Sequence, residues 1–286
     1  MQRTRPPTGG FVMAVDRQAQ ALVLRALHAR PPLVLPNAWD PGSAVAIEAA
    51  GAKAIATTSA GVSWAEGVAD AGGLGRAAAL DALRRIVAAV SVPVTADIES
   101  GYGATPAEVA STIAEVLAAG AVGVNVEDSP GAGGAPLLEP DAQAERLVAA
   151  REAAQAAGVD LCINARTDTY LAGVGSASER LAATMARAER YAAAGADVLF
   201  VPGVVDPEVI GTLVSGPLPI NVMVHPGAPT VAELAALGVV RISVGSAIAQ
   251  AAYGLAAAAT RELLGSGTYR ALEAAMGYGE LNDLLR

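Results

Sequence analysis

Short runs of strand-forming residues alternate with alanine-rich helical runs about eight times along the chain. The runs typical of buried strands cover residues 33–38, 54–59, 92–99, 123–128, 161–168, 198–203, 219–224 and 241–245. Strict alternation of strand and helix favours a parallel sheet, and about eight such units in 286 residues predict an α/β fold, the (β/α)8 TIM barrel. A doubly wound open sheet is the alternative, although the sequence has neither a Gly-rich dinucleotide fingerprint nor a P-loop.

The alternating runs follow one another without a linker, which predicts a single domain. We expect residues 16–286 to form this barrel with its C-terminal helices, and the Pro/Gly-rich residues 1–15 to form a disordered tail. Residues 246–264 are apolar on more than one face, more than a helix in contact with solvent should be. We therefore expect this eighth helix to pack on, or exchange with, a neighbouring subunit of a homo-oligomer.

Charge and cysteine content limit the partners of the chain. A formal net charge of -9 argues against nucleic acid and against an anionic membrane surface. The single cysteine, Cys162, excludes a disulfide framework and fits a reducing cytosol. Because the sequence lacks an apolar stretch long enough to cross a membrane and a start typical of a signal peptide, we expect a cytoplasmic protein that acts on a small molecule.

Histidine and lysine are scarce, and this excludes two kinds of chemistry. The only histidines are His28 and His225, too few for a multi-histidine zinc site. The only lysine, Lys53, lies in a link that leads into a strand, at the end of a barrel opposite to the catalytic end. A Schiff-base mechanism is therefore not expected.

Acidic residues end two consecutive strand candidates. Asp97 and Glu99 point the same way as Thr95 because side chains two apart share one face of a strand, and Glu127 and Asp128 end the next candidate. Two bare carboxylates about 4 Å apart repel by roughly 4 kcal/mol at an effective dielectric near 20. Each acid alone could be a solvated loop residue or a helix cap. As a group they predict a hard divalent cation, Mg²⁺ or Mn²⁺.

The order of motifs at the predicted C-terminal rim resembles one known family. From Asn37 to Gly245 the chain carries PNAWDPGSA, TTSAGVSWAEGVAD, TADIESGYG, NVED, NARTD, AERYAAAGADVLFVPG and INVMV. This order is similar to that of the isocitrate lyase/phosphoenolpyruvate mutase family. The resemblance implies a Mg²⁺-dependent enzyme that makes or consumes a pyruvate-like enolate.

The resemblance also implies roles for individual residues. Asp97 would bind Mg²⁺ most directly, while Glu99 and Glu127 would hold its water ligands. The carboxylate of a 2-oxo acid would be held by three consecutive residues, namely Ser59 and the backbone amides of Ala60 and Gly61.

Further residues would complete this site. Arg166 would face the developing oxyanion, where a metal and a guanidinium together stabilise an enolate. A salt bridge to Asp168 or Glu127 is the alternative role of Arg166. By resemblance, Asp70 would lie on a mobile loop beside the substrate. Two more residues would contribute to the substrate pocket, namely Asn221 and Trp39.

The chain departs from the family after the fourth strand. Lyases of the family carry a Lys, Cys and His segment there, whereas residues 129–139 read SPGAGGAPLLE. The usual acid of the lyases is missing, so another group must supply a proton, and Tyr102, Asp128 and His225 are the candidates. A loop of Gly, Ala and Pro suits either a gate or a plain surface connection.

These features predict a carbon–carbon lyase that acts on a small 2-oxo or 2-hydroxy acid, by decarboxylation or retro-aldol cleavage. Phosphorus–carbon chemistry on a phosphonopyruvate-like substrate is one alternative, and a barrel that binds a 2-oxo acid without turnover is another. A phosphate-sugar barrel would use Gly245 and Ser246 as an anion site. By resemblance, the homo-oligomer would be a tetramer or a dimer.

Overall fold

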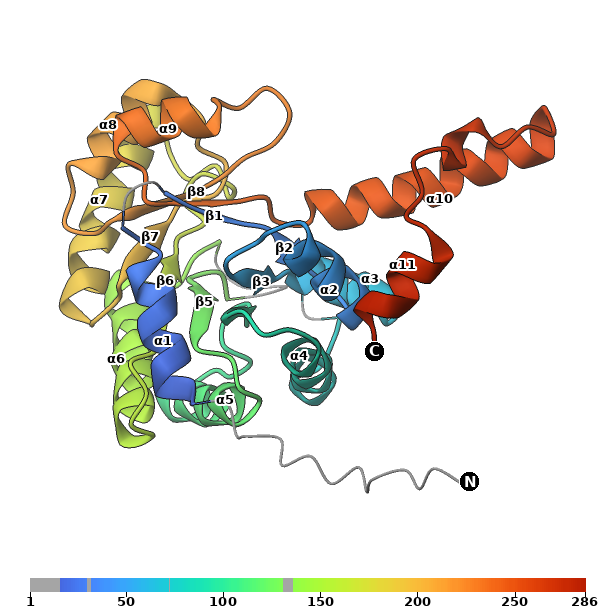
Figure 1. The fold of residues 1–286 in the computed structure, drawn as a ribbon. Coiled ribbons are helices and arrows are strands. Elements are labelled where there is room, and N and C mark those ends of the chain that lie inside the picture. The colour runs from blue at the N-terminus through green and yellow to red at the C-terminus, as the bar shows by residue number, and fades with distance from the viewer. Residues whose placement is uncertain (1–15, 30–31, 72, 131–135) are drawn as a thin grey trace, which may run out of the picture.

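The computed structural model describes residues 16–29, 32–71, 73–130 and 136–286. Within these ranges nine parallel strands form one sheet, and helices follow most of them (Figure 1). The strands are β1 (Leu33–Leu35), β2 (Asn37–Ala38), β3 (Ile55–Thr57), β4 (Val94–Asp97), β5 (Gly123–Glu127), β6 (Cys162–Arg166), β7 (Val198–Phe200), β8 (Ile220–Met223) and β9 (Arg241–Ser243). The predicted TIM barrel is confirmed.

The ring closes through a proline. The sheet order runs from β1 through β9 down to β2, so β1 and β2 stand at its two ends although they adjoin in the chain. Pro36 separates them, and a proline has no N–H to donate to a strand ladder. Its carbonyl still accepts the N–H of Ala56 at 3.1 Å. The predicted strand 33–38 is thus one bent strand of the barrel. Its first part, β1, pairs with β9, and its second part, β2, pairs with β3.

Helices cover the outside of the barrel and one closes its N-terminal end. They are α1 (Arg17–Ala26), α2 (Pro41–Ala49), α3 (Ser59–Ala65), α4 (Arg76–Ala89), α5 (Pro106–Ala118), α6 (Pro140–Ala156), α7 (Ala177–Ala193), α8 (Pro207–Val214), α9 (Val231–Leu237), α10 (Ala247–Gly265), a 3-10 turn (Arg270–Leu272) and α11 (Tyr278–Leu284). Leu24 of α1 is fully buried, and a Cβ added at Gly123 would lie 2.8 Å from it. A larger residue at Gly123 would therefore push α1 away from the barrel.

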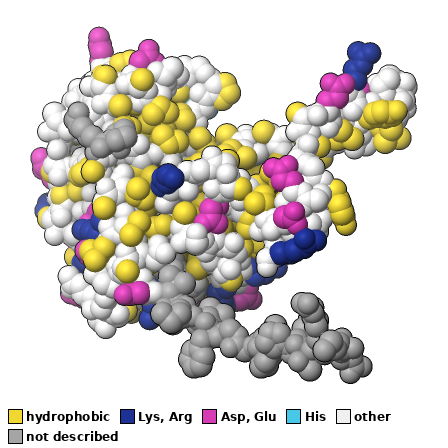
Figure 2. Space-filling model, in the orientation of Figure 1, with side chains coloured by type: hydrophobic (Ala, Val, Ile, Leu, Met, Phe, Trp, Pro, Cys, Tyr) yellow, Lys and Arg dark blue, Asp and Glu magenta, His cyan; other side chains and the backbone are white. Residues whose placement is uncertain are grey.

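The α10–α11 arm begins with α10, which projects away from the barrel, and the chain then turns back so that α11 lies beside α2 (Figure 1). In α10 only Ala249 is buried, whereas Tyr253, Leu255 and Leu264 are exposed. Apolar side chains line the projecting arm in Figure 2. Val34 on the outer side of β1 is also 41% exposed, where an outer helix of a barrel would cover it. No helix among the described residues is long and apolar enough to span a membrane. The predicted tail, residues 1–15, lies outside the described residues.

Candidate active site

One cavity of about 200 Å³ lies inside the barrel and reaches the C-terminal ends of its strands. It brings together six of the residues that the sequence predicts for the site: Ser59, Ala60, Asp70, Asp97, Arg166 and Asn221. They come from four different strands or the segments that follow them, namely β3, β4, β6 and β8, so only the closed barrel places them together. This is the end of a TIM barrel at which catalytic residues lie.

Asp97 ends β4 with its carboxylate held in a fixed orientation. One oxygen, Oδ2, accepts the backbone N–H of Ser59 at 3.1 Å, and Oδ1 accepts Nδ2 of Asn125 at 3.0 Å. The backbone N–H of Asp97 donates to Oγ1 of Thr57 at 2.8 Å. The contacts from Ser59 and Asn125 therefore fix the carboxylate, and the contact with Thr57 fixes its backbone, before any ligand binds.

The turn after Asp97 has an unusual backbone conformation. Glu99 has φ 50° and Tyr102 has φ 51°, in the left-handed region that residues other than glycine rarely adopt. The Tyr102 hydroxyl donates to Oε1 of Glu99 at 3.2 Å. Burial and then the Glu99 carboxylate raise the pKa of Tyr102, so its phenol stays protonated and remains a donor. Tyr102 lines a smaller neighbouring pocket that also contacts Ser59 and Asp97.

Arg166 ends β6 between two carboxylates. Its Nη1 lies 2.8 Å from Oε2 of Glu127, and its Nε and Nη2 donate to the two oxygens of Asp168 at 2.6 and 2.9 Å. Burial by itself lowers the pKa of Arg166, but the carboxylates of Glu127 and Asp168 raise it by more. The pKa is therefore raised overall, and the guanidinium stays charged. The salt bridges considered from the sequence are therefore present. They also fix the guanidinium at the wall of the cavity.

The pKa of Glu127 reflects the other carboxylates that lie near it at this rim. Burial raises the pKa of Glu127 to about 8, the Arg166 charge opposes that rise, and the carboxylates of Asp97, Asp168 and Glu99 add to it. A raised pKa of this origin means that the group lacks solvent and has negative neighbours. A cation at this place would relieve both.

The donor set fits a hydrated Mg²⁺. Among the described residues, no three or more His, Cys, Asp or Glu side chains are close enough to hold one ion together. Mg²⁺ keeps several waters and binds through one or two carboxylates plus the substrate, so a site of this kind does not need three direct protein ligands. Asp97 with Glu99 and Glu127 at its waters matches that chemistry.

Asp128 faces away from the cavity, although it directly follows Glu127. It is fully buried, and its Oδ2 accepts the hydroxyl of Tyr191 at 2.8 Å and Nη1 of Arg187 at 3.0 Å. Its Oδ1 accepts the backbone N–H of Asp168 at 2.9 Å. Successive residues of a strand alternate faces, which explains why only one of the two neighbouring acids enters the barrel. Asp128 thus supports the residue that holds Arg166.

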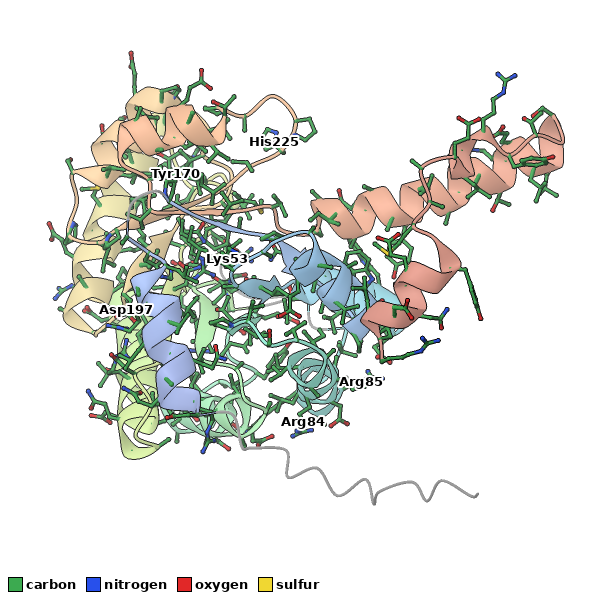
Figure 3. All side chains as sticks on the ribbon, viewed as in Figure 1. Lys53, Arg84, Arg85, Tyr170, Asp197 and His225 are labelled. Atoms are coloured by element: carbon green, nitrogen blue, oxygen red, sulfur yellow. The ribbon has the colours of Figure 1, made fainter. Side chains whose placement is uncertain are left out.

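The remaining predicted residues lie around the cavity rather than in its lining. Trp39 is partly buried against the core, and a Cβ added at Gly61 would lie 2.9 Å from the Cβ of Trp39. Gly61 donates its amide to Oγ1 of Thr58 at 3.4 Å. His225 is exposed on the loop after β8 (Figure 3), and its Nδ1 lies 3.0 Å from the carbonyl oxygen of Pro226. Residues 131–135 of the loop considered as a gate lie outside the described residues.

Arg241 is a cavity residue that is not among the predicted site residues. It begins β9 and is 2% exposed, and it lines the same cavity as Asp97. Its signal in the sequence was the alternation in RISVG, which puts Arg241 and Ser243 on one face of the strand.

Comparison with known proteins gives consistent matches. A family model described as Phosphoenolpyruvate phosphomutase matches residues 24–264. An uncharacterized protein of Mycobacterium tuberculosis is 39% identical over 220 residues, 77% of this chain and 80% of that protein. The 2-methylisocitrate lyase of Escherichia coli strain K12 is 32% identical over 182 residues, 61% of this chain and 59% of the lyase. A solved structure of phosphonopyruvate hydrolase in complex with oxalate and Mg²⁺ has a TM-score of 0.81 and 26% identity, covering 93% of this chain and 94% of that chain.

The fold and the rim define a barrel enzyme with an acidic, arginine-containing site. The chain belongs to the isocitrate lyase/phosphoenolpyruvate mutase family, a group of Mg²⁺-dependent carbon–carbon lyases and mutases. The expected family is thereby confirmed.

Proposed function

We propose that the protein is a Mg²⁺-dependent lyase that cleaves a carbon–carbon bond of a small 2-oxo or 2-hydroxy carboxylic acid through a pyruvate-like enolate. The observation that carries this proposal is the guanidinium of Arg166, held by Glu127 and Asp168 at the wall of the cavity that Asp97 also lines. A fixed cation beside a place where negative charge develops is an efficient way to stabilise an enolate.

The chain's own residues supply substrate binding and orientation. Ser59 and Ala60 begin α3 and line the cavity, and backbone amides in the first turn of a helix have no partner four residues back. The Ser59 amide is already bonded to Asp97, which sets this turn against the carboxylate. We assign Ser59 and the amide of Ala60 to the substrate carboxylate, and Asn221 to the cavity wall. The Gly61 amide would join them only by leaving its long bond to Thr58. Bound Mg²⁺ would supply Lewis-acid polarisation of the 2-oxo group.

Proton delivery is assigned to groups near the metal-binding carboxylates. Tyr102 is a buried phenol that stays protonated, and its hydroxyl lies 3.2 Å from Glu99, so it is the donor best placed to quench an enolate. Asp70 is exposed and lines the cavity opening, where it can order the substrate or water. The exposed position of His225 gives it no step in this proposal.

Two alternative functions are each supported by one observation. Phosphorus–carbon chemistry is favoured by the likeness to phosphonopyruvate hydrolase, but residues 129–139 contain no basic residue to hold a phosphoryl group. A non-catalytic oxo-acid barrel is favoured by the missing acid of the lyases in that loop.

The proposed assembly is a homo-oligomer, a tetramer or a dimer, in which the α10–α11 arm packs on a second copy. The exposed apolar face of α10 and the exposed Val34 of β1 support this, since monomers rarely expose large contiguous apolar patches. Sedimentation velocity at micromolar concentration should show an oligomer, and a single monomeric species would contradict the assembly.

A substrate screen tests the function. Purified protein with Mg²⁺ is incubated with oxaloacetate, 2-methylisocitrate, 2,3-dimethylmalate and phosphonopyruvate, and pyruvate is followed by NMR. Pyruvate from a carbon substrate, abolished by EDTA, is the expected result, with spontaneous decarboxylation of oxaloacetate subtracted in a protein-free control. Phosphate with pyruvate from phosphonopyruvate would favour the hydrolase alternative, and phosphoenolpyruvate from it would favour the mutase alternative. Silence from all four would contradict the proposed lyase for these substrates.

A further inference from the structure

Arg241 is a buried cation that forms no ion pair among the described residues. Its side chain is 2% exposed, and its Nε and Nη1 are buried without a hydrogen-bond partner. None of the ion pairs between described residues includes it. An unpaired buried guanidinium costs several kcal/mol, because the charge has left water and gained nothing in exchange.

Two other arginines of the molecule have counter-charges. Arg187 is 8% exposed and bonds Asp128 and Tyr191, and Arg166 bonds Glu127 and Asp168. Buried Arg146 has no ion pair and its Nε lacks a partner, but its Nη2 donates to the carbonyl oxygens of Ser100 and Gly103. The fold therefore supplies acceptors where an arginine has a structural role. At Arg241 it supplies none, and this difference calls for an anion from outside the chain.

Arg241 lies in a polar chamber, which is the part of the cavity nearer the N-terminal ends of the strands; we call this the lower part of the cavity. Three further buried polar atoms of this cavity lack partners: Oγ1 of Thr95, Oδ1 of Asn164 and Nδ2 of Asn221. Asn221 is the strand partner of Arg241 across β8 and β9. Donors and acceptors left open on several strands indicate a space for a polar guest, since native proteins pair nearly all such buried atoms.

The charge of Arg241 persists at neutral pH. Burial lowers the pKa of Arg241 to about 10, and the Asp97 carboxylate, together with the Cys162 thiolate at the high pH where it forms, opposes that shift. A cavity of about 200 Å³ has room for roughly six waters at about 30 Å³ each, or for a small organic acid in their place.

We propose that Arg241 is a specificity-determining residue that binds the second carboxylate of a dicarboxylic ligand inside the barrel. This inference rests on the proposed function, because the head of the ligand, its 2-oxo or 2-hydroxy carboxylate, binds above it at Ser59 and Asp97. The open polar atoms of Asn221 and Thr95 complete the lower subsite. The preferred ligands are therefore dianions rather than monocarboxylates of the same length.

The experiment compares malate with 2-hydroxybutyrate by calorimetry in the presence of Mg²⁺. The two ligands share a 2-hydroxy acid head and differ in a terminal carboxylate or methyl group. A charge-assisted hydrogen bond should make malate bind on the order of tenfold to a hundredfold more tightly to the wild type. In Arg241→Met this preference should fall to about unity, while binding of 2-hydroxybutyrate stays within about twofold. A malate preference that survives in Arg241→Met overturns the proposal.

Stability separates ligand binding from a purely structural role. Because Arg241 has no partner, Arg241→Met without ligand should melt at the same temperature as the wild type or higher. Arg187→Met is the matched control, and it should melt about 5–15 °C lower because it leaves the Asp128 carboxylate buried without its counter-charge. A loss of stability in Arg241→Met as large as in the control would overturn the proposal.

A melting experiment without metal tests the lower subsite by itself. In EDTA, sodium acetate should raise the melting temperature of the wild type more than that of Arg241→Met. If the wild type binds neither hydroxy acid with Mg²⁺ but shows this acetate effect, the proposed function fails and the anion subsite stands. If acetate affects both proteins equally, the anion subsite is overturned.

Discussion

Two polar clusters, one outside the barrel next to the end of β5 and one inside the barrel, differ in how completely they are paired. The outer cluster, Asp128 with Arg187 and Tyr191, has a partner for each of its buried side-chain polar atoms among the described residues. The inner chamber contains Arg241 and Asn221 with open donors. Paired buried groups hold a fold together, whereas unpaired ones cost stability and persist where a ligand uses them.

The two clusters are physically connected. Asp128 accepts the backbone N–H of Asp168, and the side chain of Asp168 holds Nε and Nη2 of Arg166. The outer cluster therefore positions a guanidinium that acts inside. The connection predicts that changes outside reduce stability, and that changes inside reduce binding and rate.

Breaking the outer cluster should have the largest effect on stability. Asp128→Ala removes the acceptor of Arg187 and Tyr191 and leaves a buried arginine without its counter-charge. Losing one member of a buried ion pair costs about 3–5 kcal/mol, so the free energy of unfolding should fall by that amount in urea titrations. A loss below about 1 kcal/mol would show that the cluster does not stabilise the fold as described.

Breaking the link between the clusters should affect rate. Arg166→Met removes the cation at the cavity wall, and by analogy with an oxyanion donor this should cost about 2.7–4 kcal/mol of transition-state stabilisation, or about a hundredfold to a thousandfold in kcat. Arg166→Lys is the matched variant. It keeps the charge but cannot bond both oxygens of Asp168, so it should recover only part of the rate. Full activity in Arg166→Met would contradict the assigned role.

A smaller effect on stability is expected at His28, in the link between α1 and β1. Burial, followed by the positive charge of Arg241, lowers the pKa of His28 to about 4, against about 6.5 in an unfolded chain. The unfolded state thus binds more protons between these values, and the stability present above pH 6.5 is lost as pH falls toward 4. Between pH 7 and pH 5 the wild type should lose about 1–2 kcal/mol more than His28→Gln. Equal losses in both proteins would contradict the buried, neutral state of His28.

Much of the fold was accessible from the sequence because alternation is a long-range pattern. Eight strand-and-helix units predict a closed barrel, and the strand ends locate Asp97, Glu127 and Arg166 at one rim. The break at Pro36 was visible as a proline, but its consequence depends on pairing with β9 and β3. Local signals do not reveal which distant strand completes a ladder.

The site was predicted less completely for physical reasons. An arginine that begins a strand is ordinarily a flanking, solvated residue, so Arg241 gave no sign of complete burial. Asp128 shares the motif VED with Glu127, and only the face of β5 on which it lies separates its role from that of its neighbour. Arg187, which pairs with Asp128, lies on helix α7. Because arginine side chains are mostly exposed in proteins, its position on a helix did not indicate burial.

Hydrogen exchange at C3 of pyruvate reports directly whether the rim of the barrel holds a metal site that stabilises an enolate. NMR in D₂O would follow the wild type and Asp97→Ala, with Mg²⁺ and with EDTA, and circular dichroism would verify that the variant is folded. The account predicts exchange in the wild type with Mg²⁺, and loss of exchange both in EDTA and in Asp97→Ala. Tight binding of pyruvate without exchange, or exchange that persists in EDTA or in Asp97→Ala, would contradict an enolate-stabilising metal site at this rim.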